Sequence, residues 1–377
     1  MGKRQPMYDF CIVGAGITGI TAASVLAREL DKKVVIIEKR DHIGGNCYDY
    51  VNEHGILVHK YGPHIFHTKY KEVWDYLSQF TEWIPYVHKV LAYVDGKYVS
   101  FPINIKTLEQ LFERPFTEQE MRDWIEKQRV PIDNPKNAEE MVISRMGWFL
   151  YEKFFKNYTR KQWGIDPREL SPEVTARIPI RFNRDDRYFT DPYQGIPKDG
   201  YTKMFERMLA HKNIEVILNT DYKDAIEEIR FDRLIYTGPI DYFFDCRYGK
   251  LPYRTVKFLF KVLNQESFQP VGVINYPDNT LHTRTTEFKH ITGQQHAQTT
   301  VCYEYPTDLL SEDDIYCYPL PMESVQKLYE KYEDLTIKLK SIFFLGRLAK
   351  YEYLNMDCCV KKVFDGIINR CQRQTQL

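Results

Sequence analysis

The clearest pattern of apolar and polar positions lies at the start of the chain. A short apolar run from Tyr8 to Val13 is followed by Gly14-Ala15-Gly16-Ile17-Thr18-Gly19 and then by a segment of helical period up to about Leu30. A second apolar run, Val34 to Ile37, ends on Glu38. This order predicts a strand, a glycine turn, a helix and a second strand, which is the beginning of a Rossmann-like dinucleotide-binding unit.

The period of the apolar positions becomes helical from about Trp74 to Gly164. Two strings in this region, Thr117-Glu118-Gln119-Glu120 and Asn137-Ala138-Glu139-Glu140, are typical of helix starts, because a side-chain oxygen can cap free amides while a glutamate reaches back. The second start leads into a long amphipathic segment that runs through Phe155. We therefore expect a helical insertion of about a hundred residues.

The period becomes two between Pro252 and Pro306. Val256, Phe258, Phe260 and Val262 alternate with polar positions, and similar alternation recurs in residues 271–276, 281–288 and 299–305. This pattern predicts an antiparallel sheet. Near the end of the chain, residues 342–347 predict a buried strand that ends in glycine, and a last helix follows Met356.

These segments predict an α/β fold with interleaved domains. We expect a discontinuous Rossmann-like domain made of residues 1–73, about 200–245 and 321–377. Residues 74–199 form the predicted inserted helical domain, and residues 246–320 the predicted antiparallel sheet domain.

Composition and charge narrow the choice of partners. The 377 residues include 52 basic and 52 acidic side chains, so there is no overall positive field to attract a nucleic acid or a membrane surface. The eight cysteines form no C-x-x-C pair, and no apolar stretch approaches the roughly 18 residues of a spanning helix. We expect a cytoplasmic protein with no metal site, no nucleic-acid partner and no membrane insertion.

The glycine turn indicates a specific ligand chemistry. Gly14 permits a tight turn, Gly16 lets the backbone approach a pyrophosphate, and Gly19 lets helix and strand pack closely. Glu38 lies where a carboxylate accepts hydrogen bonds from an adenosine ribose. A glycine turn without a ligand is the alternative, and the full strand-turn-helix-strand context argues against it.

Both NAD and FAD fit this turn, so other features must choose between them. A second glycine pair, Gly44-Gly45, follows the second strand, and Gly346-Arg347 with the helix start at Met356-Asp357 offers a guanidinium and a further helix N-terminus. An extended FAD uses such additional contacts more than a nicotinamide does. Ordinary turns would explain each feature alone, but together they favour an FAD-binding domain.

Arginine and aromatic residues suggest a second ligand. Arg177, Arg181, Arg184 and Arg187 cluster just before Tyr188-Phe189, and Arg284 stands alone among threonines. A solvated face with local ion pairs is the usual explanation of such a cluster, but guanidinium groups also match a diphosphate, and aromatic rings can stack on a base. The sequence therefore suggests a nucleotide diphosphate substrate.

Candidate catalytic side chains are scarce. His64, held between Gly62-Pro63 and Ile65, is equally well explained as a catalytic or as a structural histidine. Because no G-x-S-x-G, H-E-x-x-H or P-loop motif is present, a bound cofactor is the expected reagent.

Several longer strings make a family resemblance specific. The chain resembles bacterial UDP-galactopyranose mutases over essentially its full length. The resemblance is carried by residues 14–19, by Asp41-His42-Ile43-Gly44-Gly45-Asn46, by Tyr61-Gly62-Pro63-His64-Ile65-Phe66-His67-Thr68, by residues 101–104, by Tyr158-Thr159-Arg160-Lys161-Gln162-Trp163-Gly164 and by residues 346–349.

The resemblance implies an FAD-dependent isomerase that is active when its flavin is reduced. In that family, N5 of the reduced flavin attacks the anomeric carbon, and UDP-galactopyranose and UDP-galactofuranose interconvert without net redox change. The resemblance further implies an external reductant, a homodimer, and a role in the biosynthesis of cell-surface polysaccharide.

The resemblance also assigns residues. Arg177, on a mobile loop of the helical domain, and Arg284 are implied as diphosphate-binding catalytic residues, with His64 beside the isoalloxazine. The implied cofactor residues are Gly14, Gly16, Ile17, Gly19, Glu38, Lys39, Gly45, Asn46, His64, Ile65, Arg347, Met356 and Asp357. The implied substrate residues are His88, Phe154, Tyr158, Thr159, Trp163, Arg177, Tyr188, Phe189, Asn275, Arg284, Glu304, Tyr318, Tyr353 and Asn355.

Two positions depart from the family pattern. Asn355 lies where some members carry Asp, and His88 lies where some carry Asn. An N-acetylated UDP-hexopyranose is therefore an alternative substrate. An amine-oxidase-like flavin oxidoreductase and a binding module without enzymatic activity are two further alternatives, since both can share the cofactor domain.

Overall fold

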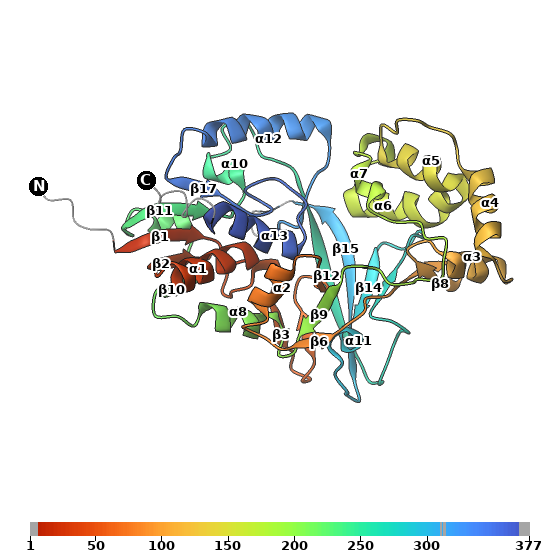
Figure 1. Cartoon of the computed structure of the whole chain (residues 1–377), viewed down its shortest axis with the longest axis horizontal. Coiled ribbons are helices and arrows are strands. Elements are labelled where there is room, and N and C mark those ends of the chain that lie inside the picture. The colour runs from red at the N-terminus through yellow and green to blue at the C-terminus, as the bar shows by residue number, and fades with distance from the viewer. Residues whose placement is uncertain (1–6, 310, 312–313, 369–377) are drawn as a thin grey trace, which may run out of the picture.

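The computed structural model describes residues 7–309, 311 and 314–368 (Figure 1). Its first layer is a five-stranded parallel sheet in the order β10 (Ile214–Ile217), β2 (Val34–Ile37), β1 (Tyr8–Val13), β11 (Phe231–Tyr236) and β17 (Ile342–Phe344). The glycine turn joins β1 to α1 (Ile17–Glu29), as the sequence predicts. The expected α/β fold with a Rossmann-like unit is confirmed.

Helices cover both faces of this parallel sheet. Phe10 and Ile12 of β1 face a core shared with α1, α8 (Tyr201–Leu209) and α13 (Met356–Val363). Cys11 and Val13 face the opposite core, to which α9 (Tyr222–Ala225), α10 (Ile240–Phe243) and α12 (Glu323–Thr336) contribute. Alternate side chains of one strand thus fill two cores, which explains why the strands read as continuous apolar runs.

A seven-stranded sheet forms the second layer. Its order is β16 (Tyr318–Pro319), β12 (Tyr253–Leu263), β15 (Thr299–Asp308), β14 (Arg284–Glu287), β13 (Val273–Asn275), β7 (Val90–Val94) and β8 (Lys97–Phe101). All neighbouring pairs are antiparallel except β13 with β7, which is parallel.

This sheet is wider than the predicted span of 246–320, because β7 and β8 come from the region predicted to be helical. They form a hairpin across Asp95 and Gly96, whose φ angles are +51° and +80°. An Asp-Gly pair between apolar alternations is a hairpin signal in its own right.

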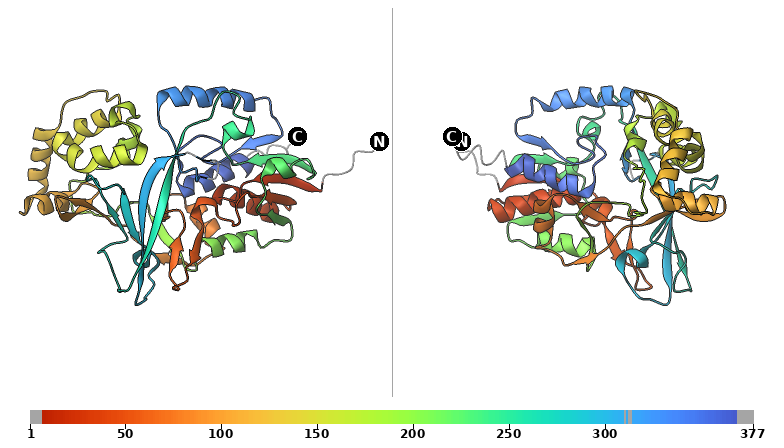
Figure 2. Two further views of the ribbon diagram at one scale, coloured as in Figure 1. Left: turned by 180° about the vertical axis from the view of Figure 1, so that it is seen from behind. Right: turned by 45° about the vertical axis from the view of Figure 1, so that its right-hand side comes forward.

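The helical domain comprises α3 (Ile105–Phe112), α4 (Glu118–Gln128), α5 (Ala138–Leu150), α6 (Lys156–Trp163) and α7 (Glu173–Ala176). The predicted start at Thr117 forms a capping box with Glu120, and Asn137 caps α5 by accepting from the backbone N–H of Glu140. In Figures 1 and 2 the long strands β12 and β15 stand between this domain and the parallel sheet.

The single long helix expected from Asn137 through Phe155 is wrong. Gly147 interrupts it with φ +79° and ψ 174°, because a Cβ atom there would lie 2.2 Å from the carbonyl oxygen of Gln128. A wide helical turn, Tyr151–Phe155, then leads into α6. Gln128 ends α4, so α4 approaches α5 too closely at the break for any residue but glycine.

Small elements connect the layers. The hairpin β3 (Asp49–Val51) and β4 (Leu57–His59) is one of them, and a three-stranded sheet of β5 (Phe66–Thr68), β9 (Tyr193–Pro197) and β6 (Trp83–Pro85) is another. The helices α2 (Lys71–Leu77) and α11 (Phe288–Thr292) and the short turns Gly45–Cys47, Pro167–Glu169 and Phe364–Ile368 complete the described elements.

Two further findings concern membranes and thiols. No helix within residues 7–309, 311 and 314–368 is long and apolar enough to cross a membrane. The cysteines in those ranges are free thiols, and Cys371 lies outside the described residues.

Candidate active site

Two adjoining cavities lie where the parallel sheet meets the second layer. The first follows the glycine turn and the carboxyl ends of β1, β2 and β11. The second lies between the seven-stranded sheet, the helical domain and the His64 loop. Asn46, His64, Arg347 and Met356 border both cavities, so a ligand in one lies next to a ligand in the other.

The first cavity has a wall built from glycine backbone. Gly14 has φ +99°, and a Cβ atom there would lie 2.3 Å from Oγ1 of Thr237. A Cβ at Gly19 would lie 2.0 Å from the carbonyl oxygen of Gly14, and one at Gly45 would lie 2.8 Å from Cα of Gly16. Only glycine allows this close packing, which leaves backbone amides free to approach a pyrophosphate.

Glu38 and Arg40 lie at the end of β2. The carboxylate of Glu38 is 6 % exposed and accepts hydrogen bonds from the backbone N–H groups of Ala15 and Arg40, at 2.7 and 2.9 Å. Arg40, which the sequence analysis missed, donates from Nη2 to Oδ1 of Asn46 at 3.0 Å, while its buried Nη1 has no hydrogen-bond partner among the described residues. A buried guanidinium nitrogen without a partner beside this cavity fits an anionic or hydroxyl-rich ligand.

Most of the predicted cofactor residues line the first cavity. Three do not: Gly19 packs beneath Gly14, Ile65 lines the second cavity, and Asp357 accepts a hydrogen bond from the N–H of Cys358 at 2.7 Å. Residues that follow β10 and β11 also line this cavity, although they were not among the predicted cofactor residues. Their signal was their place after the carboxyl ends of parallel strands; they are Thr220, Asp221, Tyr222, Thr237, Gly238, Pro239 and Tyr242.

Every residue predicted to contact substrate lines the second cavity. The helical domain supplies Phe154, Tyr158, Thr159, Trp163 and Arg177, and the segment after α7 supplies Tyr188 and Phe189. The seven-stranded sheet and the residues before β7 and α13 supply His88, Asn275, Arg284, Glu304, Tyr318, Tyr353 and Asn355. The structure brings these residues together, and their role in binding stays a prediction.

Arg284 and Glu304 form a buried ion pair on adjacent strands. They are direct partners in the pairing of β14 with β15, and Nε of Arg284 lies 2.8 Å from Oε2 of Glu304. Burial alone would lower the pKa of Arg284, but the Glu304 carboxylate and nearby tyrosines raise it well above its ordinary value. Arg284 is thus a permanent positive charge on the cavity wall.

Arg177 and Arg347 flank the ring of Tyr353. Their guanidinium carbons lie 4.7 and 5.1 Å from the ring centroid. Arg347 is held by hydrogen bonds to the carbonyl oxygens of Cys317 and Leu354. Burial alone would raise the pKa of Tyr353, but Arg177, Arg347 and Arg284 lower it to about 8. These guanidinium groups concentrate positive charge in a protein whose net charge is zero.

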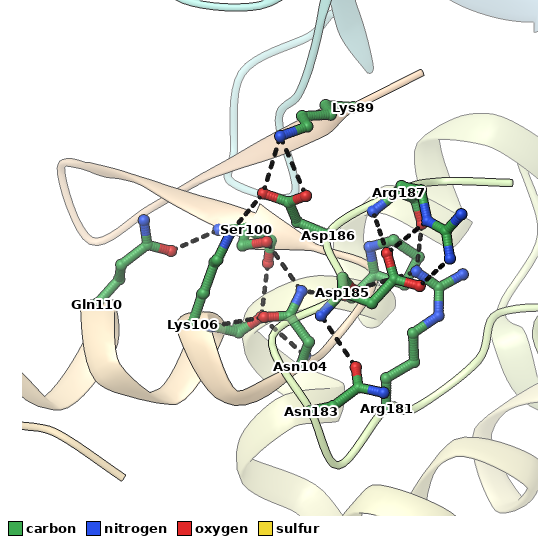
Figure 3. A network of polar contacts seen from close by, with 12 residues as sticks. Lys89, Ser100, Asn104, Lys106, Gln110, Arg181, Asn183, Asp185, Asp186 and Arg187 are labelled. Atoms are coloured by element: carbon green, nitrogen blue, oxygen red, sulfur yellow. Dashed lines mark hydrogen bonds and ion pairs between the residues drawn. The ribbon is translucent and has the colours of Figure 1, made fainter. Parts of the chain in front are cut away.

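The other arginines of the sequence cluster serve a different purpose (Figure 3). Arg181 donates to the carbonyl oxygens of Asp185 and Arg187, and Arg187 pairs with the carboxylate of Asp185 at 2.8 Å. Arg184 pairs with Glu109. The explanation by ion pairs therefore holds for Arg184 and Arg187, and Arg181 is bound to backbone carbonyl oxygens, while Arg177 alone of the cluster lines the second cavity.

Asp186 attaches the same segment to the rest of the protein. Its carboxylate accepts from Lys106 of α3 at 2.7 Å and lies 3.2 Å from Nζ of Lys89 (Figure 3). The backbone N–H of Tyr188 donates to the carbonyl oxygen of His88 at 2.7 Å. These contacts place Tyr188 and His88 beside each other on the cavity wall.

Lys161 ties α6 to the turn between β13 and β14. Its Nζ donates to the carbonyl oxygens of Tyr276, Thr280 and His282 at 2.6, 2.8 and 2.9 Å. In the sequence, Lys161 stands out only as part of a motif. Its contacts fix the helix that carries Tyr158 relative to the strand that carries Arg284.

His64 and His88 are both neutral histidines. Burial lowers the pKa of each to about 3. Nδ1 of His64 lies 2.9 Å from the carbonyl oxygen of Gly62, so Nδ1 carries the proton and Nε2 keeps its lone pair. Nδ1 of His88 lies 3.3 Å from the hydroxyl of Tyr86.

Comparison with protein families shows to which family a chain with these two cavities belongs. A family model described as UDP-galactopyranose mutase matches residues 153–353, which contain most of the second cavity, and one described as NAD(P)-binding Rossmann-like domain matches residues 12–80. The chain belongs to the UDP-galactopyranose mutase family. It is thus a member of a family of flavin-dependent isomerases, as the sequence strings predicted.

Individual members of the mutase family match over nearly their full length. A Klebsiella pneumoniae protein named probable UDP-galactopyranose mutase is 42 % identical, over 98 % of this chain and 97 % of its own. An Escherichia coli protein named dTDP-fucopyranose mutase is 38 % identical, over 95 % and 97 %. A crystal structure of a reduced UDP-galactopyranose mutase covers 98 % of this chain and 94 % of its own, with a TM-score of 0.79 and 18 % identity, and shows the shared fold.

Proposed function

We propose that this protein uses FAD to interconvert UDP-galactopyranose and UDP-galactofuranose. The observation that carries the proposal is the wall shared by the two cavities, at which a glycine-built dinucleotide cradle opens onto a cavity with Arg177, Arg284 and Arg347. A cofactor that does the chemistry and a substrate that carries a diphosphate each find matching groups there.

The first cavity fits FAD by the chemistry of its lining. The cradle of Gly14, Gly16 and Gly45 and the N-terminus of α1 would hold the pyrophosphate, and Glu38 would accept from ribose hydroxyls. Arg40, with its unpaired Nη1, would donate to the cofactor as well. When bound in its reduced form, the flavin would supply the electron pair for a bond to the anomeric carbon of the substrate.

The residues of the second cavity would orient the substrate and exclude water. Arg177 and Arg284 would bind the diphosphate and stabilise its charge as UDP leaves. Because Arg177 directly follows α7 and precedes the segment anchored by Asp186, movement of α7 relative to that anchor would close the cavity. His64, with its proton on Nδ1, would present an acceptor at the boundary between the cavities.

A second candidate is the same reaction on another nucleotide hexopyranose. The relative named dTDP-fucopyranose mutase is 38 % identical, close to the 42 % of the probable UDP-galactopyranose mutase. Asn355 and His88, the two positions that depart from the family pattern, also line the second cavity. An N-acetylated UDP-hexopyranose is therefore still an alternative substrate.

One experiment tests reaction type and substrate together. The dithionite-reduced protein is incubated separately with UDP-galactofuranose, dTDP-fucofuranose and a UDP-N-acetylhexopyranose, and the products are separated by chromatography. We expect fastest conversion of UDP-galactofuranose and almost none by the oxidised protein. Equal activity in both redox states would contradict the proposed reaction type. Faster turnover of another sugar nucleotide would show that this compound, and not UDP-galactofuranose, is the preferred substrate.

The setting of the enzyme belongs to the same proposal. The family resemblance supports a homodimer that depends on an external reductant and serves the synthesis of cell-surface polysaccharide, and the composition favours a cytoplasmic location. Size-exclusion chromatography with light scattering tests the dimer, and cell fractionation tests the location.

A further inference from the structure

His59 is a fully buried histidine that lines neither cavity. It is the last residue of β4, and its side chain is 0 % exposed. The backbone N–H of His64 donates a hydrogen bond to Nδ1 of His59 at 3.0 Å. His59 therefore touches the loop that carries His64 to the boundary between the cavities.

The direction of this hydrogen bond fixes the tautomer of His59. A backbone amide can only donate, so Nδ1 of His59 accepts and its ring proton lies on Nε2. Burial lowers the pKa of His59 to about 4, so the ring is neutral near neutral pH. Nε2 is buried and has no hydrogen-bond partner among the described residues.

The residues packed against His59 are aromatic, and none of the described residues makes a hydrogen bond to its Nε2. The rings of Tyr201 and Phe288 lie 5.6 and 5.5 Å from the imidazole, centroid to centroid. An unsatisfied buried donor costs roughly 1–3 kcal/mol. An apolar side chain would avoid that cost, so the benefit of histidine here lies in its Nδ1 acceptor.

Two hydrogen bonds hold His64, one through its backbone and one through its side chain. Its N–H is fixed by His59, and its Nδ1 donates to the carbonyl oxygen of Gly62 at 2.9 Å. Gly62 has φ +85°, and a Cβ there would lie 3.1 Å from Cε1 of Phe258, so the loop is packed tightly against β12. With Nδ1 occupied, Nε2 of His64 is left as an acceptor.

We propose that His59 is a positioning residue for His64: by accepting the His64 amide it fixes where the His64 imidazole lies at the boundary between the two cavities. The inference rests on the proposed function, because that function gives His64 a flavin to face. His59 itself lines neither ligand cavity.

Two variants at this position separate the acceptor from the ring. In His59→Asn the side-chain oxygen takes the place of Nδ1 and can accept the His64 amide, whereas His59→Phe keeps the ring volume and loses the acceptor. His59→Leu replaces the Phe variant if the latter does not fold. Val58→Ala is the control, because Val58 is the neighbouring buried residue of β4 and belongs to the core that Phe288 shares.

The measurements are made on the flavin-loaded protein. Hydrogen exchange at the His64 amide, the absorption spectrum and midpoint potential of the flavin, and kcat and KM are determined for each variant. For His59→Phe we expect faster exchange at His64, a shifted spectrum and potential, and a kcat lower by roughly 10- to 100-fold with KM almost unchanged. His59→Asn should recover most of each property.

The control defines what would overturn the inference. Val58→Ala should lower thermal stability while the flavin spectrum stays that of the wild type. If His59→Phe changes the spectrum and exchange no more than Val58→Ala does, or if His59→Asn is as impaired as His59→Phe, His59 is an ordinary core residue. Should the wild type convert no sugar while exchange and spectrum follow the expected pattern, the proposed activity fails and the positioning role stands.

Discussion

The two cavities are built by different means. The first cavity is lined largely by backbone: its tightest wall comes from Gly14, Gly16 and Gly45, which follow two neighbouring strands. The second is a side-chain structure, assembled from α6, the segment after α7 and strands of the seven-stranded sheet. An added Cβ at Gly14 or Gly45 would overlap with a neighbouring atom, whereas a side-chain site distributes its function over groups that can be removed one at a time.

The largest effect is expected from one methyl group in the backbone site. A Cβ at Gly14 would overlap with Oγ1 of Thr237 at 2.3 Å, so we expect Gly14→Ala protein to retain no measurable flavin. Gly55→Ala is a matched control, because Gly55 also has a positive φ, +79°, but nothing lies within 4 Å of its Cβ position. That control should lose roughly 1 kcal/mol of stability and keep its flavin. Flavin absorbance after purification is the measurement; full flavin in Gly14→Ala would refute the backbone character of the site.

Removal of the buried cation should be the largest single effect in the side-chain site. Arg284→Ala leaves the carboxylate of Glu304, 2 % exposed, without its partner, and we expect kcat/KM to fall by roughly a thousandfold while flavin stays bound. Arg284→Lys keeps the charge without the planar fork and should recover only part of the loss. Near-normal turnover in Arg284→Ala would show that the diphosphate binds elsewhere.

Substitution of Arg177 and of Arg187 tests whether only the first of these two arginines serves the second cavity. Arg177 lines the cavity, whereas Arg187 pairs with Asp185 on the surface. We expect Arg177→Ala to lower kcat/KM by roughly a hundredfold and Arg187→Ala to change it by less than about threefold. Steady-state kinetics of both variants under identical reduction are decisive, and equal losses would contradict the division.

The dependence of KM on pH should reveal the ionisation of Tyr353. Its pKa is lowered to about 8, so its hydroxyl is neutral below that pH and becomes a phenolate above it. The phenolate would compete with the proposed substrate diphosphate for Arg177 and Arg347, and KM should therefore rise as pH increases through about 8. Tyr353→Phe cannot ionise and should show no such rise between pH 7 and 9, which a profile of KM against pH will test. A rise of the same size in the variant would assign the titration to another group.

The smallest effect is expected from the surface anchor in Figure 3. Asp186→Asn weakens exposed pairs with Lys89 and Lys106, and such pairs contribute less than about 1 kcal/mol. KM should rise slightly and the difference from wild type should vanish at high salt. Asp75→Asn, which removes the surface pair with Lys71, is the control and should leave KM unchanged. A difference that persists at high salt would contradict a screened, surface-exposed anchor.

The contrast between the cavities also explains what the sequence could predict. The glycine turn, Glu38 and the strand that precedes Gly346 follow from local spacing, because backbone requirements appear in adjacent residues. Thr220 and Tyr222 join the same cavity only through the parallel pairing of β10 with β2, which no local pattern shows. Arg40 could be found only once the structure showed its unpaired nitrogen.

In the second cavity, local spacing could not separate Arg177 from Arg181, Arg184 and Arg187, since all four lie within one short stretch. Family resemblance made the assignment. In the structure Arg181 and Arg187 are held by contacts within their own segment and Arg184 by Glu109, which leaves Arg177 facing the second cavity. The break at Gly147 was missed for a similar reason, because its cause, the carbonyl oxygen of Gln128, belongs to another helix.

Arg347 has a thermodynamic consequence because it borders both cavities. Its guanidinium is fixed by two backbone carbonyls, so it cannot turn from one occupant to the other, and its charge acts on both at once. The occupancies of the two cavities are therefore linked: whatever factor a bound cofactor imposes on the affinity for substrate, bound substrate imposes on the affinity for cofactor. A diphosphate inhibitor that draws on this one charge will change how tightly the enzyme retains its flavin.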